Sequence, residues 1–469
     1  MKRTQAVILS VLTLASALQA QTMTLTVDSC RALAIRNNKT VHIADYQVEK
    51  AVHERRAAYT KYFPRINASG IYMYTSREFS LLSDDQKATL NGLGNAVGSM
   101  APQLAAVAPQ LNSVGAGLVD ALHTDTRNAT ALTMMLTQPV YMGGKIVAYN
   151  RITRYAEQIA RNQRNLNLQN TIVEVDEAYW QVVALQSQRR LAEGYLNLVR
   201  KLDSDVQQII GEGLATKADG LSVKVKVNEA EVTMIQIDNG MALSKMLLCQ
   251  LCGLDINSSI RLADEDSICI APPAPRQASV ERALQLRPEL NALSLATGIY
   301  HEKVKVARAE FLPTVALTGG YLATNPSVFN SFERKMKGMW NVGVAVNIPL
   351  VTSGERLHKV RAAKAEENIA RLQLDEVREK VELQVNQCSR RLNEAAERMK
   401  VAERSRVEAD ENLRYATLGM KEGVIPVSNV LEAQTAWLKA HSASVTAHID
   451  LMLADLYLQK ASGTMPTYY

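Results

Sequence analysis

The feature that most constrains this chain is an internal duplication. One offset of 210 residues relates Pro, Gly and Leu positions over more than a hundred residues. The matched pairs are Pro139 and Pro349, Gly144 and Gly354, Gly213 and Gly423, Leu221 and Leu431, and Gly253 and Gly463. Further upstream, RALAIR at 31–36 resembles RALQLR at 282–287. We therefore expect two tandem repeats, at 21–260 and 280–469, with a linker at 261–279.

Proline and glycine mark the boundaries of long helices within each repeat. No proline lies between Pro139 and Pro272, or between Pro349 and Pro426. Both long stretches are broken near a glycine cluster and then continue, which predicts helical hairpins. The helices expected in the first repeat are 39–62, 146–211 and 217–252, and those in the second are 288–310, 355–420 and 427–462.

The helix expected at 355–420 carries an apolar seam whose spacing alternates between four and three residues. This spacing is typical of a coiled coil. The seam consists of Val381, Val385, Cys388, Leu392, Ala395, Met399 and Ala402, and the first repeat has Val175, Ala178, Val182 and Leu185. A helix of this length reaches about 100 Å. Because a lone hairpin has no globular core, we expect it to pack against other hairpins.

The first twenty residues indicate export from the cytoplasm. A basic start at Lys2 and Arg3 precedes an apolar stretch from Val7 to Leu14 and a cleavage site at 17–20. We interpret residues 1–20 as a removed signal peptide. No later run of apolar residues is long enough for a transmembrane helix. A membrane location would therefore require a closed β-barrel.

Four segments alternate between apolar and polar or small residues, as β-strands do. These strands are expected at 65–76, 130–141, 314–324 and 340–350. An ordinary half-buried sheet gives the same alternation, but the long helices offer no second apolar layer to cover it. We therefore expect one face to contact lipid. The lipid-facing residues are expected to be Val342, Val344, Val346, Ile348, Leu132, Met134 and Leu136.

The number of strands predicts how many copies assemble. Four strands cannot close, and an open edge in lipid would leave backbone groups without hydrogen bonds. Two copies would give eight strands, whose interior fills with side chains, whereas three copies give twelve and leave a passage. We therefore expect a mainly α-helical fold with a transmembrane β part, assembled as a homotrimer with a 12-stranded β-barrel. An insertion at 77–129 is expected on the extracellular side.

The chain resembles the TolC family of outer-membrane efflux proteins, the outer membrane factors, over nearly its whole mature length. The residues that carry the resemblance are Arg287–Leu290, Phe311–Pro313, and the two hairpin tips at 213–221 and 423–433. The resemblance implies that the twelve strands continue into a 12-helix periplasmic α-barrel. It also implies a passive exit duct for efflux or type I secretion, which docks a periplasmic adaptor (a membrane fusion protein) and an inner-membrane pump.

The same resemblance assigns roles to the hairpin tips. In this family the tips form the periplasmic aperture, which places Asp219, Asn429 and Glu432 there. The chain departs from the better-known pattern, with Asn429 at an acidic position and with Met420 and Ile425 where an aromatic residue and an arginine stand. Exposed apolar residues at a tip predict a contact surface for an adaptor. The adaptor-contact residues are expected to be Gly213, Leu214, Thr216, Gly423, Val424 and Ile425.

Other function classes find little support in the sequence. Charges of both signs are interleaved at a formal net charge of +6, whereas a nucleic-acid-binding protein concentrates basic residues. Cys249 and Cys252 lack the second pair of a zinc site, and they are either two packing residues or a disulfide. The seven histidines are scattered and form no HExxH motif. We expect no enzyme activity, no cofactor, no metal and no nucleic-acid partner.

Two other functions share some of these features. A periplasmic coiled-coil adaptor or structural protein without a pore would have the signal peptide and the hairpins. It would not need duplicated strands with a lipid face. A secreted helical pore-forming toxin would lack the tip motifs. The sequence therefore favours a channel in the outer membrane of a Gram-negative bacterium that extends into the periplasm.

Overall fold

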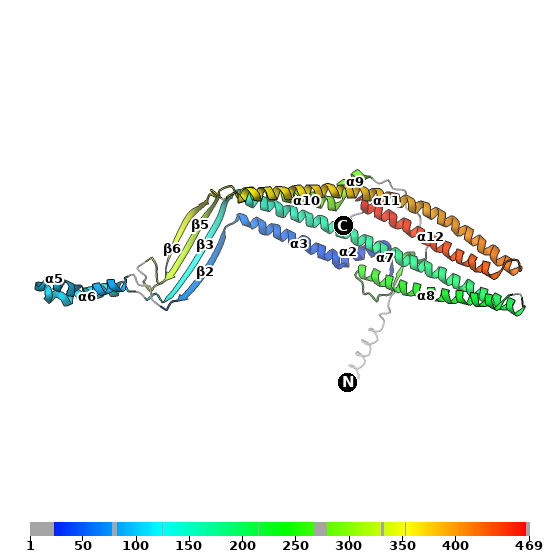
Figure 1. The fold of residues 1–469 in the computed structure, drawn as a ribbon, viewed down its shortest axis with the longest axis horizontal. Coiled ribbons are helices and arrows are strands. Elements are labelled where there is room, and N and C mark those ends of the chain that lie inside the picture. The colour runs from blue at the N-terminus through cyan, green and yellow to red at the C-terminus, as the bar shows by residue number, and fades with distance from the viewer. Residues whose placement is uncertain are drawn as a thin grey trace, which may run out of the picture. The chain divides into compact units, whose positions relative to one another are not determined.

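Long helices dominate the computed structural model, which describes residues 23–76, 82–123, 125–213, 215–266, 279–329, 333–351 and 353–465. The predicted signal peptide at 1–20 lies outside the described residues. The helices and strands are drawn in Figure 1, and the chain divides into two units. A helical unit comprises the described residues of 1–53, 153–300 and 366–469, and a second unit comprises those of 54–152 and 301–365.

Helical hairpins form most of the first unit. In Figure 1, α7 runs beside α8 and α11 runs beside α12. The helices that lie wholly or partly in this unit are α2 (Val27–Asn37), α3 (Lys39–Tyr59), α7 (Lys145–Gly211), α8 (Lys217–Leu251), α9 (Val280–Leu286), α10 (Pro288–Ala309), α11 (Glu355–Lys421) and α12 (Val427–Ala461). The bounds of α7 and α8 differ from those of α11 and α12 by the same 210 residues that relate the sequence pairs. Among the described helices, none combines the length and the apolar character needed to cross a lipid bilayer.

The apolar seam of α11 is buried along most of its length. Val381, Val385, Leu392, Ala395 and Ala402 are each at most 9% exposed. Val381 and Val385 pack in one cluster with the α9–α10 region, and Leu392 and Ala395 pack in another with α12. Nearer the tips, a further cluster joins residues of α7, α8, α11 and α12. The hairpins are therefore held together by side chains from both halves of the chain.

A short parallel sheet ties the start of the chain to the segment that follows α8. Strand β1 (Met23–Leu25) pairs with β4 (Ile260–Leu262), and Leu25 and Leu262 are each 1% exposed. The segment predicted as a linker at 261–279 thus begins with strand residues and the 3-10 helix η4 (Ala263–Asp266). Sequence periodicity missed these strands because three residues are too few to show an alternation. Residues 267–278 lie outside the described part of the chain.

The second unit contains an antiparallel sheet, which has four strands among the described residues. Its order is β2-β3-β5-β6, with β2 (Arg65–Tyr74), β3 (Asn128–Met142), β5 (Thr314–Asn325) and β6 (Lys337–Asn347). The register shifts between Pro139 and Tyr141, where a proline removes a ladder donor. The sequence placed the last strand at 340–350, three residues too far along the chain.

The segment between β2 and β3 folds as short helices. They are α4 (Asp84–Asn91), α5 (Leu93–Met100), η3 (Pro102–Val107) and α6 (Ala108–Ala121). Glycines allow these helices to approach closely. A Cβ atom at Gly94 would lie 1.9 Å from the Ala108 carbonyl oxygen, and one at Gly115 would lie 1.9 Å from that of Leu90. Larger residues at these two positions would separate the helices.

Candidate functional site: the strand face and the hairpin tips

The sheet register brings the predicted apolar residues of all four strands onto one face. Residues directly opposite each other in paired strands point to the same side of a sheet. Met134 lies opposite Ala68 and Tyr321, and Tyr321 lies opposite Trp340. Further rows on this face are Gly70, Leu132 and Ala323; Ile66, Leu136, Gly319 and Val342; Gln138, Leu317 and Val344; and Tyr141, Val315 and Val346. The large residues of this apolar face are mostly exposed, with Val342 at 75%.

The opposite face of the sheet is more polar. Ser69 lies opposite Thr133, and Thr137 lies opposite Arg65 and Thr318. Asn341 and Asn347 of β6 share this face by alternation. This face thus carries more hydrogen-bonding side chains than the other, and the apolar residues Met135, Leu322 and Met339 also lie on it.

One predicted member of the apolar face does not belong to a strand. Ile348 lies after the end of β6, because the last residue pair of the ladder joins Asn347 to Thr314. The next position would face Pro313, which has no N–H group to donate. The prediction that Ile348 belongs to this strand face was therefore wrong.

The first hairpin tip is closed by a capping box. Gly213 adopts a φ of +76°, a left-handed conformation that favours glycine. Thr216 Oγ1 accepts a hydrogen bond of 3.2 Å from the Asp219 N–H, and Asp219 Oδ2 accepts one of 2.9 Å from the Thr216 N–H. These bonds satisfy N–H groups at the start of α8. The Thr216 hydroxyl also lowers the pKa of Asp219 by donating to its carboxylate. Leu214 lies outside the described residues.

The second tip has a different structure. Gly423 has a φ of +73°, and the N–H groups of Val424 and Ile425 both donate to the Gly419 carbonyl, at 2.8 and 3.1 Å. Val424 is 79% exposed. Ile425 is only half-exposed, because its side chain packs over Gly419, where a Cβ atom would lie 2.5 Å from Ile425 Cδ1. The apolar surface at this tip therefore rests mainly on Val424.

The first turns of α12 separate core residues from the predicted aperture residues. Val427, Val430 and Ala433 are buried against the other helices of the tip cluster. Asn429 and Glu432 are exposed on the remaining faces. Glu432 is therefore presented to solvent, while Asp219 is engaged in its capping box.

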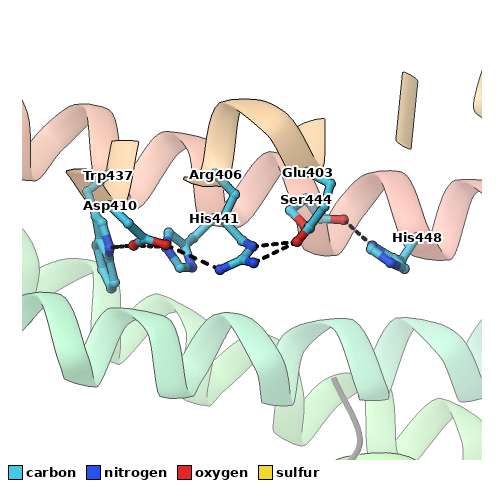
Figure 2. A network of polar contacts seen from close by, with 7 residues as sticks. All are labelled: Glu403, Arg406, Asp410, Trp437, His441, Ser444 and His448. Carbon is cyan, nitrogen blue, oxygen red and sulfur yellow. Dashed lines mark hydrogen bonds and ion pairs between the residues drawn. The ribbon is translucent and has the colours of Figure 1, made fainter. Parts of the chain in front are cut away.

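A polar network lies farther along the second hairpin, between α11 and α12 (Figure 2). Asp410 Oδ1 accepts a hydrogen bond of 2.7 Å from Trp437 Nε1 and lies 2.8 Å from His441 Nε2. Its other oxygen accepts a bond of 3.2 Å from Arg406. Arg406 also donates to Glu403, 2.6 Å away. One carboxylate thus joins three side chains from two helices.

The network continues toward the other end of the hairpin through Glu403. Ser444 Oγ donates to Glu403 Oε2 at 3.1 Å, and His448 Nδ1 lies 2.9 Å from the Ser444 carbonyl oxygen. The hydrogen bond from Arg406 lowers the pKa of Glu403. Apolar clusters lie on both sides of this polar stretch along the hairpin.

Sequence reasoning missed this network. Its members on α11 and α12 follow the same three-and-four spacing as the apolar seam, at 403, 406 and 410 and at 437, 441, 444 and 448. This heptad spacing could have predicted a polar network between the helices. It did not, because polar residues at heptad spacing are usually assigned to a solvated face.

A model of a known family matches most of the chain. The model described as Outer membrane efflux protein matches residues 31–254 and 279–464. The chain belongs to this outer membrane efflux protein family. The two matched segments correspond to the two halves related by the sequence repeat.

Curated members of the outer membrane efflux family are similar over most of the chain. The Outer membrane protein TolC of Vibrio cholerae is 21% identical over 364 residues, which cover 77% of this chain and 83% of that protein. The Alkaline protease secretion protein AprF of Pseudomonas aeruginosa is 25% identical over 344 residues, covering 71% and 69%. The family places this protein in the outer membrane of a Gram-negative bacterium and supports a role as an outer-membrane exit channel.

A solved structure shares the fold of this outer membrane efflux protein. The crystal structure of the outer membrane protein VceC from Vibrio cholerae matches with a TM-score of 0.72 at 16% identity. The match covers 93% of this chain and 96% of that chain. The arrangement of helices and strands is therefore that of a TolC-like channel.

Proposed function

We propose that this outer membrane efflux protein is a homotrimeric, passive exit duct rather than an enzyme. One observation carries the proposal: a four-stranded sheet with one apolar face, whose edge strands β2 and β6 have no partner among the described residues. All residues of both edge strands are exposed. In hydrocarbon, each unpaired backbone group would cost several kcal/mol, roughly 2–7 for an amide without a partner.

Pairing β2 of one copy with β6 of the next removes both edges. Three copies with four strands each give a barrel of twelve strands, which is wide enough to leave a passage. The four helices α7, α8, α11 and α12 of each copy likewise give twelve helices. The matching bounds of the two hairpins support a tandem duplication, since equal hairpins can alternate around one axis. The apolar strand face then contacts lipid and the polar face lines the passage.

The hairpin tips offer a contact surface for partner proteins. The exposed Val424, beside a glycine turn, offers an apolar contact for a periplasmic adaptor. The duct serves a tripartite efflux or type I secretion system, in which an adaptor connects it to an inner-membrane pump that supplies the energy. The AprF relative is named for secretion, which supports this class of partner.

Cysteine crosslinking in outer membranes tests the proposed closure. In a background without native cysteines, Ser69→Cys on edge strand β2 is combined with a cysteine scan of 339–343 on edge strand β6. Oxidation should give covalent dimers and trimers, with no larger species. The matched control is Ser69→Cys alone, which should give no trimer. A detergent-independent monomer, or a ladder that continues beyond three copies, would overturn the proposal.

A further inference from the structure

Three buried cysteines lie where the start of the chain meets the end of α8. Cys30 of α2, Cys249 of α8 and Cys252, which caps α8, are each 0% exposed. They belong to one apolar cluster with residues of α7 and the β1–β4 sheet. The duct proposed above makes no use of these thiols.

The two segments fit together closely at this point. Asn38 Nδ2 donates a hydrogen bond of 2.9 Å to the Leu251 carbonyl oxygen. Gly253 has a φ of +67°, and a Cβ atom there would lie 2.5 Å from the Asn37 Cβ. Any larger residue after Cys252 would therefore push α2 away. The contact keeps the end of α2 packed against the end of α8, the helix that Cys252 caps.

The direction of each thiol distinguishes one pair from the others. Cys252 Sγ donates to the Cys30 carbonyl oxygen at 3.7 Å. Cys249 Sγ instead donates to the Ser258 carbonyl oxygen at 3.9 Å. Cys30 and Cys252 are therefore in contact, while Cys249 is directed toward a different segment.

We propose that Cys30 and Cys252 are joined by a disulfide bond in the mature protein. Outer-membrane proteins fold in an oxidising compartment, where paired cysteines are converted to disulfides. The bond would connect residues 222 positions apart and close a loop that contains β2, β3, α7 and the whole of α8. It would attach the first helix of the mature chain to the end of the first half.

The oxidant is a dithiol–disulfide oxidase of the periplasm. The thiolate of one cysteine attacks the oxidase disulfide and forms a mixed disulfide, and the oxidase thiolate that leaves takes up a proton. The second cysteine then attacks its partner's sulfur and releases the second oxidase thiolate. The chain loses two hydrogen atoms and the oxidase becomes a dithiol.

The reaction must precede closure of the core. Both sulfurs are inaccessible in the folded unit, and the hydrogen bond with Cys252 together with burial raises the pKa of the Cys30 thiol. The Cys30 thiolate is therefore disfavoured in the folded state, whereas the same contact lowers the pKa of Cys252; burial keeps an oxidase away from both sulfurs. Oxidation belongs to the stage at which α2 first docks on α8.

Peptide mapping of the wild-type protein tests the proposal directly. Outer membranes are denatured in iodoacetamide without reductant, which alkylates free thiols. Trypsin should release the peptide that ends at Arg31, linked to the peptide 246–261. Chymotrypsin then cleaves after Leu251 and separates Cys249 from Cys252. The expected product links Cys30 to Cys252, with Cys249 alkylated, and it should be lost on reduction and in cells without the oxidase.

Other outcomes and variants overturn or support the assignment. Alkylated Cys30 and Cys252 would overturn it, as would a bond from either residue to Cys249, Cys269 or Cys388. Cys249→Ser and Cys388→Ser should both retain the linked peptide. Loss of the linked peptide in Cys249→Ser would show that Cys249 forms the bond, which would overturn the assignment to Cys30 and Cys252. Because the wild-type map needs no variant at Cys30 or Cys252, misfolding of such a variant does not affect the result.

Discussion

His441 Nε2 lies 2.8 Å from Asp410 Oδ1 and joins the two helices of the second hairpin. The same oxygen accepts the indole N–H of Trp437, whose ring lies 4.3 Å from the His441 ring. This polar contact lies between apolar clusters along the α11–α12 hairpin. Since a displaced register would leave these groups without partners, the network specifies one alignment of the two helices.

Removal of the Asp410 carboxylate should destabilise the hairpin. Asp410→Ala leaves the donors of Arg406, Trp437 and His441 without this acceptor, at a cost of about 1–3 kcal/mol. Glu411→Ala is the matched control, because Glu411 is exposed and pairs with Arg414 on its own helix. Thermal unfolding followed by circular dichroism in detergent should show a lower midpoint for Asp410→Ala. Equal midpoints for the two variants would contradict a role for the network in stability.

Alkaline pH should weaken a contact between α12 and α7. The Tyr457 hydroxyl donates to Glu177, and burial together with this hydrogen bond raises the pKa of Tyr457 to about 12. A tyrosine whose pKa is raised in the folded state stabilises the fold at pH values below its ordinary pKa of about 10. This stabilisation is lost as the pH rises toward 12. The stability difference between wild type and Tyr457→Phe, measured by unfolding at several pH values, should shrink across that window. A difference that is constant from pH 9 to about 12 would contradict this assignment.

A charge on the apolar strand face should prevent membrane insertion. Val344 is 61% exposed and lies opposite Leu317, whereas Asn341 lies on the polar face. Val344→Lys places an ammonium in lipid at a cost of about 2–4 kcal/mol near the midplane. Heat-modifiable migration of outer-membrane fractions should show loss of assembled protein for Val344→Lys and normal assembly for Asn341→Lys. Equal tolerance of both variants would argue against a lipid-facing role.

Glu432 should contribute to ion selectivity at the periplasmic aperture. Threefold symmetry would bring three exposed copies of this carboxylate together. In planar bilayers, Glu432→Ala should reduce cation selectivity and block by polyvalent cations. Glu408→Ala removes an exposed carboxylate from α11, more than a dozen residues before the tip, and should leave both properties unchanged. Conductance of Glu432→Ala that matched wild type in both respects would refute the assignment.

Val424 should be required for export but not for assembly. Val424→Asp places a charge on the proposed adaptor contact. The matched control, Val407→Asp, places the same charge on α11 away from the tip, at a valine that is 51% exposed. We expect loss of export and of crosslinking to the adaptor only in Val424→Asp, with normal amounts of assembled protein for both. Unchanged export by Val424→Asp would remove the tip from the docking surface.

Prediction from sequence succeeded best where one local rule acts over many residues. The alternation around Met134 and Val342 identified two sets of side chains that the register places on one face of the sheet. The spacing from Val381 to Ala402 identified a seam that is buried for most of its length. The alternation failed to predict the end of the last strand. Ile348 lies beyond the ladder because the residue opposite it is Pro313.

The sequence by itself determined the periodic elements and their duplication, because each depends on residue spacing and on the positions of Gly and Pro. Only the tertiary structure decided which distant residues meet. It paired Leu25 with Leu262, placed Cys30 against Cys252 and joined Asp410 to His441. Such contacts arise from the packing of whole helices and strands, which no local pattern encodes, since a polar or sulfur-containing side chain has the same sequence signal whether it meets solvent or a partner.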